Sequence, residues 1–106
     1  MTAKEFQKVL DKTLGQVSSI LGVKAKEYDT SDRLHNFKQA GHLQNLTPEQ
    51  ALAGMMVKHT VSLYDMIQSE GDFPIAKWDE KIVDHINYLL LLKALVVEKA
   101  TDELKD

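Results

Sequence analysis

Apolar side chains recur at steps of three and four residues along most of this chain, which is the spacing of an amphipathic α-helix. Helix-interrupting residues are scarce, because only two prolines and five glycines occur among 106 residues. No segment alternates with period 2 for the length of a strand. The sequence therefore predicts an all-α fold, a bundle of four to five helices formed by one domain over residues 1–106.

Local patterns mark the first two predicted helices. Thr2 followed by Glu5 is a capping box, and it opens a helix that we expect to end at Gly22. Glycine at position 15 should weaken this helix in its middle. A short second helix is expected over residues 33–40, with Gly41 at its end.

The clearest helix start in the sequence is Thr47-Pro48-Glu49-Gln50, which combines a capping threonine, an early proline and a closing glutamine. The helix that follows should run to about Ser69. The last helix is expected over about 77–100. The polar tail, about residues 99–106, should fray.

Composition limits the class of protein. The chain is 43% apolar and carries 13 basic and 16 acidic residues, for a net charge of -3. This near-neutral balance argues against non-specific nucleic-acid binding, and no apolar run has the length of a membrane span. The absence of cysteine excludes thiol catalysis and Cys-ligated metal. We therefore expect a soluble, cytoplasmic protein.

A narrow polar strip lies along the third predicted helix, where Lys58, Ser62 and Asp65 share one face. Apolar residues flank it on both sides, with Val57, Val61 and Tyr64 at one edge and Met55 and Met66 at the other. A solvated face is usually broader. Two interpretations stay open, a ligand-binding strip and a polar contact between helices.

The fourth predicted helix carries a similar group. Glu80, Asp84 and Asn87 fall within about 60° of one another, and Tyr88 lies one turn beyond Asp84. Two carboxylates at this spacing repel unless a cation intervenes, and carboxylate and amide oxygens are ligands that Mg²⁺ accepts. The alternative is a solvent-facing acidic pair near the helix start, where the helix dipole favours negative charge.

The remaining candidate ligands carry weaker signals. Asn36 begins the apolar face of the second helix, and Tyr28 precedes that helix. Histidines show no metal-binding spacing, so we interpret them as surface or core-edge residues; they are His35, His42, His59 and His85.

Several short motifs resemble a family of small phage and prophage proteins. The motifs are Lys26-Glu27-Tyr28-Asp29, Asn36-Phe37, Leu46-Thr47-Pro48-Glu49-Gln50-Ala51, Met55-Met56-Val57-Lys58 and Asp84-His85-Ile86-Asn87-Tyr88. That family is in turn similar to the all-α nucleoside triphosphate pyrophosphohydrolases, the MazG-like superfamily. Those enzymes bind Mg²⁺ on carboxylates of two facing helices and split the α–β phosphate bond of a nucleotide.

The resemblance implies specific roles. The acidic pair of the superfamily's last helix falls on Glu80 and Asp84, which would be the catalytic and metal-binding residues. The candidate ligand-binding residues, taken from the two polar strips and the motifs above, are Tyr28, Asn36, Lys58, Ser62, Asp65, Asn87 and Tyr88. The glutamate cluster of the preceding long helix is missing here, and Lys58 on that face could meet a phosphate directly.

Three functions therefore remain open. The chain could be a divergent Mg²⁺-dependent pyrophosphohydrolase, a module that binds or sequesters a nucleotide-like ligand, or a helical oligomer that binds a host protein. We expect self-association, most simply a dimer, because the third helix is apolar almost all round and the fourth contains four consecutive leucines. If the chain is phage-encoded, it would act in the host cytoplasm.

Overall fold

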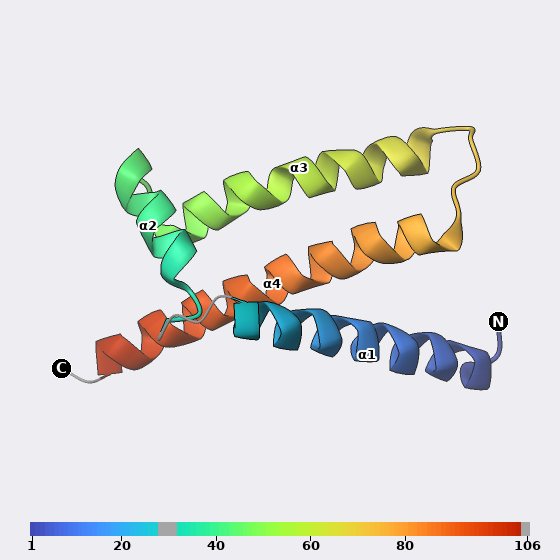
Figure 1. Ribbon diagram of the computed structural model, residues 1–106, viewed down its shortest axis with the longest axis horizontal. Helices are drawn as coiled ribbons and strands as arrows, with labels where there is room; N and C mark the ends of the chain where they lie inside the picture. The colour runs from blue at the N-terminus through green and yellow to red at the C-terminus, as the bar shows by residue number, and fades with distance from the viewer. Residues whose placement is uncertain (28–31, 105–106) are drawn as a thin grey trace.

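The computed structural model describes the backbone of residues 1–27 and 32–104, and the side chains of residues 1–21 and 32–104. These ranges contain four helices and no strand: α1 (Ala3–Glu27), α2 (His35–Gln44), α3 (Pro48–Gln68) and α4 (Ile75–Leu104) (Figure 1). The predicted all-α class is confirmed. Within the described ranges, no helix combines the length and apolarity needed to cross a membrane.

Both predicted capping boxes are present. Thr47 Oγ1 accepts the Gln50 amide at 3.1 Å, and Gln50 Oε1 accepts the Thr47 amide at 2.9 Å. The box that opens α1 uses Thr2 and Glu5 in the same way, with both bonds between 3.1 and 3.2 Å. Helix starts were predictable here because a capping box is completed by neighbours in sequence.

The prediction that glycines end the first two helices was wrong. Helix α1 runs through Gly15 and Gly22 to Glu27, since a glycine costs a helix only about 1 kcal/mol. Helix α2 begins at His35, later than predicted, and continues through Gly41 to Gln44. A left-handed residue then closes it, Asn45 with φ 57°.

The fourth helix is longer than predicted at both ends. It begins at Ile75, directly after Pro74, and reaches Leu104. Most of the tail expected to fray is therefore helical, with the Thr101 hydroxyl donating to the Val97 carbonyl at 2.9 Å.

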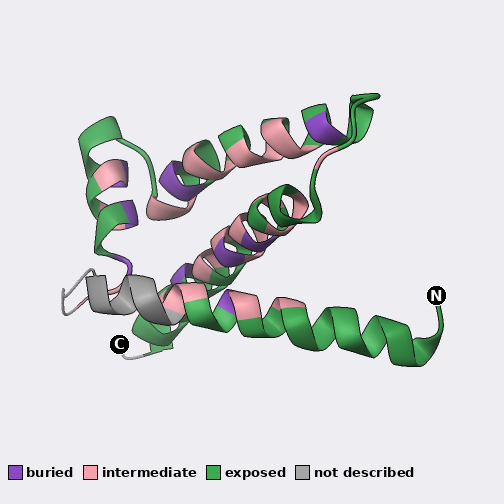
Figure 2. Ribbon diagram, turned by 45° about the vertical axis from the view of Figure 1, so that its right-hand side comes forward, coloured by how far each residue is buried: buried purple, intermediate pink, exposed green. Residues whose placement is uncertain are grey.

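The core lies where α2, α3 and α4 meet. Leu34, Phe37, Leu52 and Leu95 form a buried cluster, and Leu52 has no exposed surface. Met55, Tyr88, Leu91 and Leu92 pack against it. Helices α3 and α4 form a long hairpin, α2 crosses its open end, and α1 contacts α4 alone among the described helices (Figures 1 and 2).

An ionic clamp joins the chain before α2 to the end of α4. Lys38 Nζ lies 2.7 Å from Asp32 Oδ2 and 2.6 Å from Glu98 Oε1. Hydrogen bonds to Asp32 and then Glu98 raise the pKa of the Lys38 ammonium to about 12. The Asp32 carboxylate also accepts the Leu34 amide at 2.9 Å, so it orders the turn before α2.

Candidate functional site

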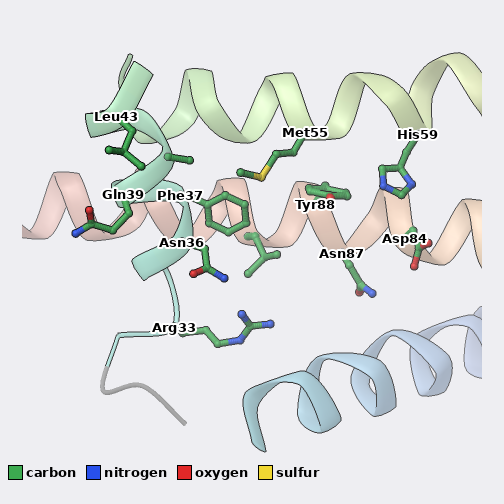
Figure 3. Close-up of a pocket in the computed structure, with 12 residues that line it drawn as sticks. Arg33, Asn36, Phe37, Gln39, Leu43, Met55, His59, Asp84, Asn87 and Tyr88 are labelled. Carbon is green, nitrogen blue, oxygen red and sulfur yellow. The ribbon is translucent and has the colours of Figure 1, made fainter. Parts of the chain in front are cut away.

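A cavity of about 580 Å³ opens between α2, α3 and α4, beside the core cluster. Its apolar lining comes from Phe37, Ala40, Leu43, Met55 and Leu91. Its polar lining comes from Arg33, Asn36, Gln39, His59, Asp84, Asn87 and Tyr88 (Figure 3). An apolar hollow of this size with a few convergent polar groups is the usual form of a small-molecule site.

The most informative residue of this cavity is Asn87. Its side chain is 4% exposed, and neither Nδ2 nor Oδ1 has a hydrogen-bond partner among the described residues. An unsatisfied buried polar group costs about 1–3 kcal/mol. Both atoms are covered by neighbouring groups, so a ligand that accepts from Nδ2 and donates to Oδ1 would remove this cost once a neighbouring side chain moves aside.

Two charged groups face the same cavity. Arg33 extends from the chain before α2 toward α4, and Asp84 lies one turn before Tyr88 on α4 (Figure 3). A guanidinium presents a planar fork of donors that matches phosphate or carboxylate oxygens. The cavity can therefore bind an anionic group near Arg33 while Asp84 accepts hydrogen bonds or shares a cation.

An aromatic pair forms part of the wall. The rings of His59 and Tyr88 lie 5.0 Å apart between centroids, tilted by 45°. Burial, and then the charge of Asp84, raise the pKa of the Tyr88 hydroxyl, so Tyr88 stays neutral and can donate. Ring faces and edges of this kind suit a planar aromatic ligand.

The cavity brings together only some of the residues predicted from sequence. Asn36, Asp84, Asn87 and Tyr88 line it, from two different helices. The polar strip of α3 does not line the cavity. Lys58 and Asp65 are exposed, and Ser62 is half-buried. The strip therefore borders solvent, since the apolar edge formed by Val57, Val61 and Tyr64 is exposed as well. Tyr28 lies outside the described residues.

Glu80 borders a second, more open hollow of about 610 Å³ between α1 and α4. Asp84 lines both hollows. At the α1 side, Asp79 is held by Lys12 at 3.8 Å and by the Gln16 amide at 3.5 Å. Within the described ranges, no three His, Asp or Glu side chains group closely enough to hold a metal. Glu80 and Asp84 can therefore supply only two carboxylates to a Mg²⁺ ion. Water or phosphate oxygens would have to supply its remaining ligands.

Sequence reasoning missed Arg33 and His59 as cavity residues. His59 is half-buried, and it lies seven residues after Leu52 and seven before Met66, both of which are buried. That heptad spacing could have located His59 on the inner face of α3. Arg33 precedes α2 in a turn, so no helical periodicity points to it.

Comparisons with protein-family models, with curated proteins and with solved structures found no match for this chain.

Proposed function

We propose that this chain binds a nucleotide or a nucleotide-like, phosphate-bearing small molecule in the cavity between α2, α3 and α4. The observation that carries the proposal is the buried, unpartnered carboxamide of Asn87. A folded protein retains such a cost where function requires it, because an apolar residue of similar size would relieve it.

The rest of the lining fits the parts of a nucleotide. The Asn87 carboxamide can pair with a donor–acceptor edge of a base, in the way carboxamides read bases. The His59–Tyr88 wall offers a surface for the base, and Arg33 supplies donors to phosphate oxygens. Apolar side chains from α2, α3 and α4 line the rest of the space.

The resemblance to phage proteins and to the MazG-like superfamily supports a nucleoside triphosphate as the ligand and a role in the host cytoplasm. It also supports Mg²⁺ as a companion of the ligand. Asp84 and Glu80 would contribute carboxylate oxygens to a hydrated ion that the triphosphate chain also holds. Lys58 is exposed on α3 and does not line the cavity, so its predicted role in phosphate binding is separate from the contacts proposed here.

A second candidate function is hydrolysis of the same ligand. Asp84 favours it, because this carboxylate lines the nucleotide cavity and also the hollow that contains Glu80. Hydrolysis between the α- and β-phosphates would add one water and yield a nucleoside monophosphate and pyrophosphate. In the alternative, a non-catalytic module, the same cavity binds or sequesters the ligand unchanged.

The proposal is tested by titrating the four ribonucleoside and four deoxyribonucleoside triphosphates into the chain by calorimetry, with and without Mg²⁺. We expect at least one to bind, and Asn87→Leu and Arg33→Ala each to weaken it by tenfold or more. Lys8→Ala and Gln68→Leu are matched controls, because both residues are exposed and outside the cavity. They should leave affinity unchanged.

Binding that is absent for every nucleotide, or that survives both cavity substitutions, would overturn the proposal. Pyrophosphate release is measured in the same mixtures. Release that disappears in Asp84→Asn would favour the hydrolase, and binding without release would favour the sequestering module.

A further inference from the structure

The outer side of α4 carries a long apolar face that no other helix of the described chain covers. Its members are seven residues apart and expose much of their surface: Ile75 72%, Ile82 41%, Leu89 50% and Val96 50%. They span about 32 Å of helix at 1.5 Å per residue. This face, called the α4 heptad face below, is separate from the cavity, since none of these four residues lines it.

A strict seven-residue repeat has a specific meaning. On a straight helix, residues seven apart shift around the helix axis by about 20° per heptad. When the helix winds around a second helix, these residues all face that partner. Two other helices also expose apolar residues, Phe6, Val9, Leu10 and Leu14 on α1 and Val57, Val61, Tyr64 and Ile67 on α3, but neither set holds a seven-residue repeat over four members. The pattern therefore favours a helix as the occupant of the α4 heptad face.

The surface area of the chain indicates how large that occupant is. The chain exposes 7930 Å², whereas a folded 12.0 kDa protein is expected to expose about 6,000 Å². Its radius of gyration is 16.4 Å, against about 13 Å for a compact domain of this length. The excess, about 1,900 Å², falls within the range of areas that one subunit of an obligate homodimer buries.

We propose that a second copy of this chain covers the α4 heptad face, with the two α4 helices packed antiparallel about a two-fold axis. Antiparallel pairing about an axis near Ile86 places Lys93 of each copy opposite Asp79 of the other, at the edge of the face where Asp79 also pairs with Lys12 of its own α1. Lys93 interrupts the face between Leu89 and Val96, so an opposite charge at that point stabilises one register. A two-fold interface uses the same patch on both chains, as a self-complementary face requires.

The first test is the molecular mass in solution by light scattering at tens of micromolar. We expect twice the 12.0 kDa of one chain for the wild type, and the mass of a single chain for Leu89→Glu. Tyr64→Glu is the matched control, because Tyr64 is an apolar position on α3 that is 59% exposed against 50% for Leu89, and this variant should remain a dimer. A wild-type monomer, or a dimer that survives Leu89→Glu, would overturn the proposal.

A second test does not depend on a charged substitution that could impair folding. The chain contains no cysteine, so single cysteines introduced at Leu89 or at Tyr64 report on one surface each. With a short bis-maleimide reagent, Leu89→Cys should give a covalent dimer and Tyr64→Cys should not. Equal cross-linking of the two variants would contradict docking on the α4 heptad face. Helicity by circular dichroism confirms that each variant is folded.

Discussion

A methyl group added to Gly41 would lie 2.7 Å from the carbonyl oxygen of Leu46. The chain turns back on itself at this point, because the Leu46 amide donates to the Gly41 carbonyl at 2.8 Å and Asn45 adopts the left-handed conformation. This closure brings the start of α3 directly against α2. Gly41 therefore allows a close approach of two backbone segments, and it does not end the helix.

We expect Gly41→Ala to destabilise the protein by about 1–2 kcal/mol. The gain in helix propensity, about 1 kcal/mol, is smaller than the cost of pushing backbone atoms apart. Chemical denaturation measures the change in free energy of unfolding. Gly54→Ala on α3 is the control, because its added Cβ meets nothing within 4 Å, and it should stabilise by about 0.5–1 kcal/mol. Two changes of the same sign would contradict this account.

Replacing Asn87 by leucine should raise the stability of the ligand-free protein while it removes nucleotide binding. Leucine has a similar size and leaves no buried polar group without a partner, so we expect a gain of about 1–3 kcal/mol. Thermal and denaturant unfolding without ligand measure it. A loss of stability would show that Asn87 has a structural role instead.

The Lys38 clamp should contribute to stability between mildly acidic and alkaline pH. Its partners raise the pKa of Lys38 from 10.5 to about 12, so this contribution is full below pH 10.5 and is lost as the pH rises toward 12. The hydrogen bond from Lys38 is the main cause that lowers the pKa of Asp32 from 3.8. The contribution of the Asp32 carboxylate to stability is therefore full above about pH 4 and is lost in stronger acid.

Because all three side chains are more than a third exposed, we expect Lys38→Met to cost only about 0.5–1 kcal/mol at pH 7, and less at high salt. The difference in unfolding free energy from wild type, measured between pH 3 and 11, should be flat in the middle and should shrink at both ends. Lys99→Met provides the baseline, because Lys99 is exposed and next to Glu98. A flat difference across the whole range would argue against the clamp.

Truncation at the centre of the core should have the largest effect on stability. Leu52 has no exposed surface, and Leu52→Ala removes contacts to the cluster of α2, α3 and α4. We expect a loss of about 2–5 kcal/mol by denaturant titration. Val61→Ala on the exposed side of the same helix should change stability by about 0.5 kcal/mol or less. If the two variants lost similar amounts of stability, Leu52 would not be at the centre of the core.

Sequence reasoning succeeded where structure depends on neighbours along the chain. The capping boxes at Thr2 and Thr47 were predicted because each closes within three residues. Of the group predicted on the last helix, Asp84, Asn87 and Tyr88 line one cavity, because helical spacing puts them on neighbouring turns of α4, whereas Glu80 borders the other hollow.

Predictions failed where the outcome depends on contacts between distant segments. A glycine such as Gly41 can end a helix or allow close packing, and its contact with Leu46 decides which. Helix α3 has apolar residues around most of its circumference, so its periodicity did not identify the side that meets α4. The prediction therefore emphasised Lys58, whereas the inner face presents His59.

Among the described helices, α1 packs on α4 and on no other, which gives the described chain two units that can open separately. No described residue of α1 lines the cavity between α2, α3 and α4, so α1 can detach while that cavity keeps all of its described walls. Backbone amides of α1 should therefore exchange with deuterium at the same rate with and without nucleotide. Amides of α2 and of the facing turns of α3 and α4 should exchange more slowly once the ligand holds those three helices together.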